Sequence, residues 1–418
     1  MKKLIDRYVI FLVVLTVTAI LIRSLHFREY LNFSTDQASF SIRSIELWNN
    51  KEITLIGPSI SFHYMGRELY QGSITYYFQL LFLLPAHFDP VIASYLFMLF
   101  GVAMVIPLYL GVTNLFDKRI AIFVSLLYLL IPPYINYSRF LWNPNFQFVL
   151  TPLLIYFLGL YSKYKKSYYA VFLGVAAGSL LLFHYQYIVI IILTGGYLLL
   201  LRHQTKHLLY YICGLVIGFS PILLFELRNN FYNFQTLLLY LNNFQNVASE
   251  GVMKSLNVHY FLSISLFLII FIAGWFSRHI TFIRTSIFYI VFLLINLFMY
   301  VPRPSHGFGM ANNWNYLLEV KTHEIIKAEN LTSFNIVHLG YDTVATVQKY
   351  LLKRDGITIE SDYYQNQYLF IITDKTDYMK TNTYEVYNFQ PSIVLKKWNI
   401  NDTYTMYLRK RIDKKEGL

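Results

Sequence analysis

Residues 90–116 read PVIASYLFMLFGVAMVIPLYLGVTNLF, and these 27 residues include no Asp, Glu, Lys, Arg or His. A helix that crosses the hydrocarbon core of a bilayer needs about 20 consecutive apolar residues. The stretch therefore predicts a membrane-spanning helix. Similar runs recur on both sides of it, so the fold is decided by how many of them cross the membrane and in which direction.

The composition agrees with a membrane protein. Of the 418 residues, 56% are hydrophobic and only 14% are charged, and the mean hydropathy is +0.43. A soluble domain carries roughly 25% charged residues. This balance excludes a cytosolic enzyme, a disordered protein and a disulfide-stapled secreted domain. The single cysteine, Cys213, cannot form an internal disulfide, and its apolar surroundings predict a small buried hydrophobe.

Nine stretches without charged residues or histidine are candidate spans. They are Tyr8–Ile22, Pro90–Phe116, Ile120–Ser138, Phe140–Ser162, Ser167–Phe183, Tyr185–Leu201, Leu208–Phe225, Tyr260–Ser277 and Thr285–Pro302. A further apolar piece, Ile74–Ala86, is too short to span and predicts an interfacial or re-entrant helix. The first stretch has a basic start but no small-residue cleavage site, so it predicts a retained anchor.

The positions of the basic residues give the orientation, because Lys and Arg in short loops stay cytoplasmic. With the N-terminus inside and Ile74–Ala86 not crossing, the basic clusters all fall on the cytoplasmic side. They are Lys2, Lys3 and Arg7; Lys118 and Arg119; Lys163, Lys165 and Lys166; Arg202 and Lys206; and Arg278 and Arg284. The net charge of +12 is therefore typical of a positive-inside membrane protein and does not indicate nucleic acid binding.

Two large segments lie outside the lipid under this topology. One is the first outer loop, residues 23–89, within a transmembrane domain of residues 1–302. The other is the tail, residues 303–418, where Phe334–Leu339 and Tyr368–Thr373 have the composition of strands and Thr343–Lys353 has helical spacing. The fold class is thus an α-helical polytopic membrane protein with a small C-terminal α/β extracytoplasmic domain.

Asp36 is the first candidate for chemistry. It stands in Ser34-Thr35-Asp36-Gln37-Ala38, soon after the first span. Ser34 or Asp36 could cap a helix that starts here, which would need no catalytic role. The alternative is a general base that accepts the proton of an acceptor hydroxyl.

Arg139 is the second candidate, in the outer turn YSRFLWNPN of residues 137–145. A lone arginine outside opposes the positive-inside trend. It is either an anchor that reaches the lipid headgroups beside aromatic residues, or a guanidinium that holds a lipid-linked phosphate. Asn143 in the same turn precedes the next helix.

The remaining candidates are polar residues on the same outer side. His184 and Gln186 stand in a tight turn, where they could cap a helix or line a cavity. Glu226 and Arg228 end a span, where they could pair with each other or meet headgroups. The loop that begins with the turn signal Gly57-Pro58 adds His63, Arg67, Gln71 and Tyr76. No spacing matches a metal cage, so no metal ligand is assigned, and the role of a divalent cation stays open.

The order of these motifs resembles a known family. An early acidic residue in the first outer loop (Asp36-Gln37) is followed by Leu55-Ile56-Gly57-Pro58, then by Gly72-x-x-x-Tyr76-Tyr77, Phe88-Asp89-Pro90 and the turn of residues 137–145. The chain is similar to bacterial membrane glycosyltransferases of the C superfamily (family 39-like), in the branch related to protein O-mannosyltransferases and to the aminoarabinose transferase of lipid A. The resemblance covers about residues 1–161. It departs from the protein mannosyltransferases at Gln37, which replaces an acidic residue, and at Gln71-Gly72-Ser73, which replaces His-Pro-Pro.

The resemblance implies a multi-pass enzyme of the plasma membrane and cell envelope, which transfers a sugar from a polyprenyl-phosphate donor to a hydroxyl of a glycan, lipid or protein acceptor. It gives Asp36 the catalytic role. Phosphate chemistry then needs cations, for which Arg139, Arg67 and Arg228 are the candidates. The side chains expected to line the substrate cavity are Gln37, His63, Gln71, Tyr76, Asn143, His184, Gln186 and Glu226.

Two other functions were weighed. A transporter or flippase of lipid-linked sugars would show charges in mid-span, broken helices or an internal repeat, and the sequence has none of these. A non-catalytic member would use its outer domain to bind glycans or cell-wall polymer.

Overall fold

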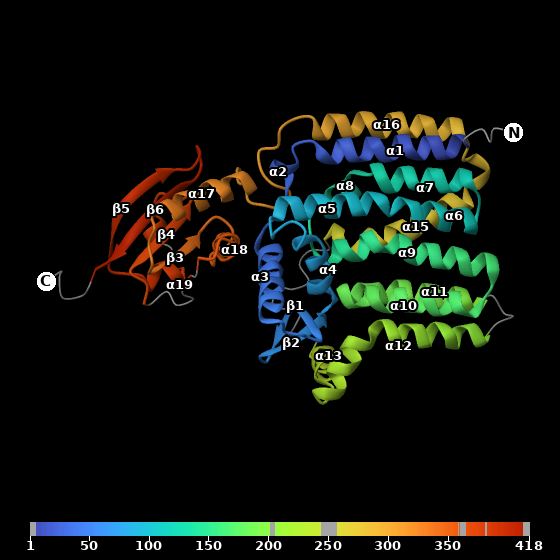
Figure 1. The fold of residues 1–418 in the computed structure, drawn as a ribbon, viewed down its shortest axis with the longest axis horizontal. Helices are drawn as coiled ribbons and strands as arrows, with labels where there is room; N and C mark the ends of the chain where they lie inside the picture. Colours follow the sequence, from blue (N-terminus) through green and yellow to red (C-terminus); the bar gives the residue numbers. More distant parts are fainter. Residues whose placement is uncertain are drawn as a thin grey trace. The chain divides into compact units, whose positions relative to one another are not determined.

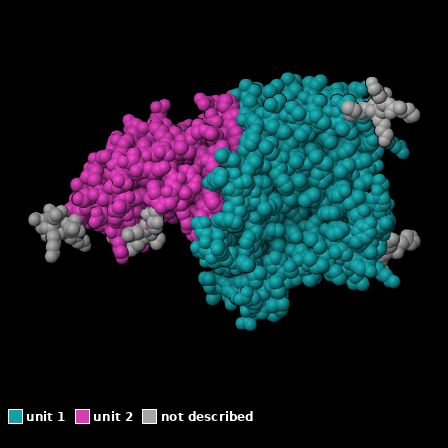
Figure 2. Space-filling model, in the orientation of Figure 1, with its two compact units in different colours: residues 1–25, 47–87, 92–301 teal, residues 26–46, 88–91, 302–418 magenta. Residues whose placement is uncertain are grey.

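The computed structural model describes residues 6–200, 205–243, 257–357, 359, 365–380 and 383–412. The basic residues Lys2, Lys3 and Arg202 lie outside these ranges. The chain forms two compact units (Figure 2), and each is described by itself. Unit 1 contains residues 1–25, 47–87 and 92–301, and unit 2 contains residues 26–46, 88–91 and 302–418. The expected domains, 1–302 and 303–418, remain a proposal.

Unit 1 is built of long helices that run side by side (Figure 1). They are α1 (Arg7–Ser24), α5 (Pro90–Ala103), α6 (Val105–Leu115), α7 (Lys118–Leu130), α9 (Asn143–Tyr164), α10 (Ser167–Phe183), α11 (Ile188–Leu200), α12 (Thr205–Arg228), α15 (Leu262–Trp275) and α16 (Phe282–Tyr300). In the described part of the chain, six helical segments are long and apolar enough to cross a membrane: Arg7–Ser24, Pro90–Leu115, Asn143–Tyr164, Lys206–Arg228, Val258–Trp275 and Phe282–Tyr300. The chain is thus a multi-pass membrane protein, while the count of nine spans remains a proposal.

Prolines divide two of the expected spans. The run Pro90–Phe116 forms α5 and α6, with Met104 between them, because Pro107 has no N–H to donate to the carbonyl one turn earlier. The run Ile120–Ser138 is not one helix either. It forms α7 and the short α8 (Pro132–Tyr137), since Pro132 and Pro133 cannot continue α7 but fit a helix start.

Glycines set the closest helix contact in unit 1. A Cβ atom at Gly174 or Gly178 of α10 would lie within 2.5 Å of a carbonyl oxygen of α12, and one at Gly214 or Gly218 of α12 would lie as close to α10. Both pairs have glycine four residues apart, the spacing that lets membrane helices approach backbone to backbone. Cys213 on the same helix is exposed, so the prediction of a buried thiol was wrong. The apolar spacing could not distinguish a face toward lipid from a face toward protein.

The segment of unit 1 between α3 (Thr35–Asn50) and α4 contains a hairpin that was not expected. Strands β1 (Ile56–Tyr64) and β2 (Arg67–Gly72) pair in antiparallel fashion, and α4 (Ile74–Leu83) follows. Gly57-Pro58 lies inside β1 rather than in a turn. Proline is tolerated there because the register shifts between Ile56 and Ser59, a bulge that relieves Pro58 of a ladder bond.

Short helices complete unit 1. They are η1 (Tyr185–Tyr187), α13 (Tyr232–Asn242), η3 (Val258–Phe261) and η4 (Ser277–His279). α13 and the hairpin are in contact, because the side-chain amide oxygen of Asn233 accepts the backbone N–H of Tyr70 at 3.0 Å.

Unit 2 is a small α/β fold. Its helices are α2 (Phe27–Tyr30), α3 (Thr35–Asn50, of which the part up to Glu46 belongs to unit 2), α17 (Tyr316–Ala328), α18 (Thr346–Arg354), η5 (Tyr378–Lys380) and α19 (Tyr384–Tyr387). Its strands are β3 (Phe334–His338), β4 (Tyr368–Thr373), β5 (Ser392–Asn399) and β6 (Thr405–Arg411). The sheet order is β3-β4-β6-β5, with β3 and β4 parallel and the other pairs antiparallel. The two strands and the helix expected in the tail are confirmed.

The loop residues 26–46 belong to unit 2 together with the tail. Phe33 contacts the rings of Tyr316 and Tyr350, with centroids 5.9 and 5.0 Å apart. Glu46 at the other end forms an ion pair with Lys353. The segment that carries Asp36 is therefore held by residues more than 260 positions later in the chain.

Candidate functional site

Asp36 lies in the first turn of α3 and its side chain is exposed. Two hydrogen bonds of the capping-box type stabilise the helix start. The side-chain oxygen of Gln37 accepts one from the backbone N–H of Ser34 at 3.1 Å and one from the Ser34 hydroxyl at 2.7 Å. Ser34 and Gln37 thus fill the capping positions. Asp36 adds a negative charge where the helix dipole favours one.

Arg139 is buried at the end of unit 1 where α1 ends. Its guanidinium donates to the carbonyl of Leu25 at 2.5 Å and lies over the ring of Tyr300, 5.5 Å from the centroid. The side chain therefore points into the helix bundle. This position does not suit an anchor that reaches out to lipid headgroups.

A second buried arginine lies beside it. Arg23, at the end of α1, donates to the carbonyl of Leu129 at 2.7 Å and to the hydroxyl of Ser138 at 2.9 Å. Ser138 directly precedes Arg139 in the chain. The same short segment therefore accepts a hydrogen bond from Arg23 and carries Arg139. Two like charges in low-dielectric surroundings form a region of strong positive potential.

Side-chain amides join four elements next to this region. Asn143 at the start of α9 donates to Gln71 of β2 at 2.5 Å and to the carbonyl of Phe183 at 3.0 Å. Gln147, one turn further, donates to the carbonyl of His184 at 2.7 Å and accepts from Gln186 at 2.9 Å. This amide network (Gln71, Asn143, Gln147 and Gln186) fixes the hairpin and the α10–η1 turn on α9.

A row of rings runs from Trp142, in the same turn as Arg139, to His184. The ring centroids of Trp142 and His259 are 4.5 Å apart, and those of His259 and Tyr260 are 4.1 Å apart. The centroids of Tyr260 and His184 are 5.4 Å apart. Burial, and to a smaller extent the nearby His259, lower the pKa of His184 to about 4. His184 is therefore neutral at physiological pH, and its Nδ1 accepts the backbone N–H of Gln186 at 3.4 Å.

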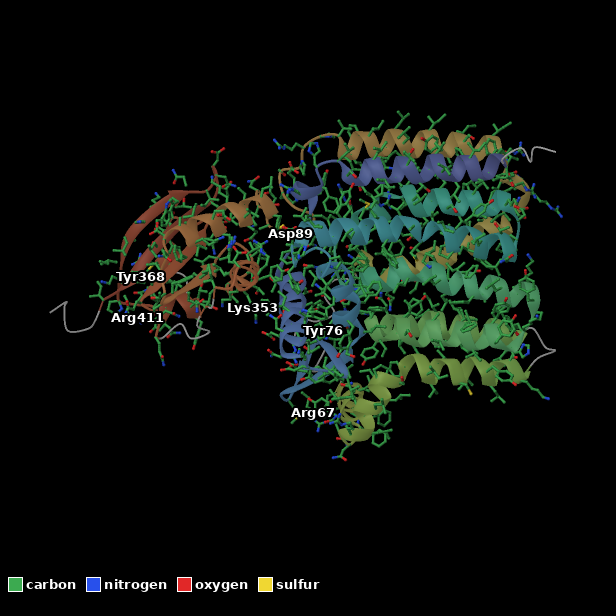
Figure 3. All side chains as sticks on the ribbon, viewed as in Figure 1. Arg67, Tyr76, Asp89, Lys353, Tyr368 and Arg411 are labelled. Atoms are coloured by element: carbon green, nitrogen blue, oxygen red, sulfur yellow. The ribbon has the colours of Figure 1, made fainter. Side chains whose placement is uncertain are left out.

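The other candidates lie around the hairpin and α13. Arg67 on β2 lies over the ring of Tyr232, 5.2 Å from the centroid (Figure 3). The Glu226 carboxylate accepts the backbone N–H groups of Asn233 at 3.2 Å and Phe234 at 3.1 Å, so it caps α13. Arg228 is exposed at the end of α12.

Tyr76 is largely buried on α4 (Figure 3). His63 lies on β1, opposite Glu68 of β2, and its side chain lies outside the described residues.

The structure thus brings Gln71, Asn143, His184 and Gln186 together, with Arg139 at the other end of the aromatic rings. Asp36 and Gln37 lie in unit 2. Sequence reasoning missed Arg23, His259 and Gln147. Arg23 had a usable signal, since it is a basic residue at the predicted outer end of a span, as Arg139 is. Among the described residues, no group of three or more His, Cys, Asp and Glu side chains could hold a metal ion.

Comparisons with known proteins show which family part of the chain is similar to. Residues 73–225 match the sequence profile of the dolichyl-phosphate-mannose-protein mannosyltransferases. No curated protein matches the chain significantly. Among solved structures, the chain is similar to an oligosaccharyltransferase from Archaeoglobus fulgidus, crystallised with zinc and sulfate, with 17% identity and a TM-score of 0.41. The match covers 76% of this chain and 43% of that protein, so this chain spans less than half of its length. The matched residues include α4, the turn with Arg139 and the α10–η1 turn, and they support a membrane glycosyltransferase similar to this family, in agreement with the order of the motifs.

Proposed function

We propose that the chain moves a sugar from a polyprenyl-phosphate-linked donor to a hydroxyl acceptor at the outer face of the plasma membrane. The observation that carries the proposal is the family match, because the name of that family specifies a sugar on a polyprenyl phosphate, dolichyl-phosphate-mannose. The matched region contains Arg139 and three members of the amide network, Asn143, Gln147 and Gln186.

The chemistry needs few groups. The acceptor oxygen attacks the anomeric carbon while the bond from that carbon to the phosphate oxygen breaks, and polyprenyl phosphate leaves with the bonding electrons. A phosphate leaves without a general acid but needs positive charge nearby. The acceptor hydroxyl loses its proton to a base. One carboxylate and one or two cations are sufficient.

Arg139 is the proposed donor-phosphate ligand, and Arg67 and Arg228 are the next candidates. The charge of Arg23 supports Arg139, because the two guanidinium groups share the same end of unit 1. The amide network and His184 form the proposed wall of the donor cavity. Their mutual hydrogen bonds keep the wall rigid, which preorganises the site for the phosphate.

Asp36 is the proposed general base. Its exposure suits a group that meets an acceptor arriving from water, and at the start of α3 Gln37 accepts hydrogen bonds from the backbone N–H and the hydroxyl of Ser34. We expect Asp36→Asn to keep the fold and to lower the transfer rate by about 10²–10⁴, as is typical for loss of a general base.

The test uses the full chain in proteoliposomes with a panel of radiolabelled polyprenyl-phosphate sugars and a membrane extract as acceptor source. We expect wild type to transfer the sugar and Asp36→Asn to lose the transfer. Ser39→Ala should keep it, because Ser39 is an exposed residue one turn further along α3. Donor movement across the bilayer without transfer would instead identify a flippase. Normal turnover of Asp36→Asn would remove Asp36 from the catalytic step.

A further inference from the structure

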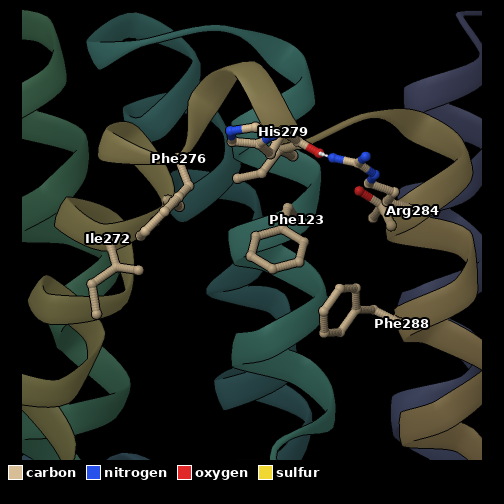
Figure 4. Close-up of a pocket in the computed structure, with 9 residues that line it drawn as sticks. Phe123, Ile272, Phe276, His279, Arg284 and Phe288 are labelled. Atoms are coloured by element: carbon tan, nitrogen blue, oxygen red, sulfur yellow. Dashed lines mark hydrogen bonds between the residues drawn. The ribbon is translucent and has the colours of Figure 1, made fainter.

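A cavity opens between α7, α15 and α16 of unit 1, away from the candidate site (Figure 4). Its volume is about 310 Å³. Phe123, Ile272, Phe276 and Phe288 face into it, and Ala273 and Thr285 lie on its wall. This volume is too small for a whole lipid and suits part of one acyl chain.

The polar groups of the cavity stand at one end. Arg284 and His279 both line it there, and Arg284 donates to the His279 carbonyl at 2.7 Å (Figure 4). Arg284 belongs to the first turn of α16, where the helix dipole adds positive potential. A cation at the mouth of an apolar cavity matches the two parts of an anionic phospholipid.

Contacts place this mouth among the other basic residues of unit 1. Arg7 at the start of α1 lies over the ring of Phe282, 5.1 Å from the centroid, and Asp6 forms an ion pair with Lys118 at 2.5 Å. The cavity therefore lies at the basic end of the helices, which the positive-inside rule assigns to the cytoplasmic leaflet. Basic pockets between membrane helices on that side bind anionic lipid headgroups.

We propose that this cavity binds an anionic phospholipid of the cytoplasmic leaflet, with an acyl chain among Phe123, Phe276 and Phe288 and its phosphate at Arg284. The proposal does not depend on the glycosyltransferase activity. The lipid would fill the space between α15 and α16 on one side and α7 on the other, so it should stabilise the contact of these helices.

Native mass spectrometry of the full chain in detergent, titrated with dioleoylphosphatidylglycerol or dioleoylphosphatidylcholine, tests the proposal. We expect preferential binding of phosphatidylglycerol to wild type. Arg284→Gln should weaken that binding about fivefold, the effect of one basic residue at a membrane surface. Lys166→Gln, which removes an exposed charge at the α9–α10 turn of the same end, should bind as wild type does.

A second variant acts on the apolar part. Ala273→Leu places a larger side chain in the cavity and should reduce binding while Arg284 stays in place. Equal binding of the two lipids, or equal loss in Arg284→Gln and Lys166→Gln, would overturn the proposal. Stronger binding of polyprenyl phosphate than of phosphatidylglycerol would reassign the cavity to the donor lipid.

Discussion

At the scale of the residue, Arg139 carries the most specific expectation. Its planar guanidinium donates to the carbonyl of Leu25 and lies on the ring of Tyr300, and an ammonium group cannot reproduce a planar fork. We predict that Arg139→Lys weakens donor use by about 1–3 kcal/mol, the range for a hydrogen bond to a charged group. The measurement is the transfer rate against donor concentration, with thermal unfolding measured in parallel.

Arg119→Lys provides the matched control, because Arg119 is exposed and pairs with Asp117 at the other end of the helices. An unchanged donor dependence in Arg139→Lys, with only Arg139→Ala impaired, would contradict the phosphate fork. If Arg139→Lys and Arg139→Ala both used donor as wild type does, the phosphate would be held elsewhere, with Arg67 or Arg228 to be tested next.

His184 provides a prediction about acid. Its pKa in the folded protein is about 4, below the ordinary 6.5, because burial penalises the charged imidazole. Between pH 6.5 and 4 the unfolded chain therefore binds a proton that the folded chain does not, and the free energy of unfolding falls as the pH falls. We predict that His184→Asn lessens the drop in melting temperature between pH 7 and 4.5.

Asparagine suits this test because its side-chain oxygen can still accept the N–H of Gln186. His87→Asn is the control, since His87 is exposed. Equal acid sensitivity of wild type and His184→Asn would show that folding does not lower the pKa of His184.

At the scale of the element, the glycines of α10 and α12 determine how the helices that carry His184 and Glu226 approach each other. A Cβ atom at Gly178 would lie 2.5 Å from the carbonyl oxygen of Leu215, so Gly178→Ala must push the helices apart. We predict a loss of about 1–3 kcal/mol, as for other overpacked interiors. Thermal unfolding in one detergent measures it.

Gly196→Ala on α11 is the control, because a Cβ atom there would meet no heavy atom within 4 Å. This exchange should be neutral or slightly stabilising, since alanine is the better helix former. A melting temperature of Gly178→Ala equal to that of Gly196→Ala would mean that the close contact of α10 and α12 does not contribute to stability.

These elements also show what a sequence can predict. The helices α1, α9, α10, α12, α15 and α16 follow from uncharged runs, because the need to bury the backbone in lipid forces them into helices. The hairpin β1–β2 and α13 were missed, since neither has a strong period, and their stability depends on contacts such as Tyr70 with Asn233. In the candidate site, Asn143 and Gln186 could be named from the sequence, but their partner Gln147 could not, because it lies within an apolar run.

At the scale of the whole molecule, side-chain contacts divide unit 1 into two ends. The basic end contains the pairs Asp6–Lys118 and Arg7–Phe282, together with Lys163, whose ammonium group donates to Asn114 at 3.1 Å. The other end contains Arg23 with Ser138 and Trp142 with His259. The helix α1 begins at the basic end, and its last turn lies at the other end. Contacts of this kind also assign the two ends of α16.

We propose the topology that the basic residues predict, in which nine segments cross, the N-terminus lies in the cytoplasm and residues 303–418 lie outside. α16 begins beside Arg7 at the basic end and finishes at Tyr300, which contacts Arg139 at the opposite end, so the tail leaves from the end that the positive-inside rule places outside.

We predict that a cysteine in place of Asp402, exposed in the tail, reacts with a membrane-impermeant maleimide in intact cells once Cys213 is replaced by serine. A cysteine in place of Lys166 at the basic end should react only after lysis. Labelling of the second position and protection of the first would invert the topology, and with it the proposed place of sugar transfer, because Arg139, His184 and the amide network would then face the cytoplasm.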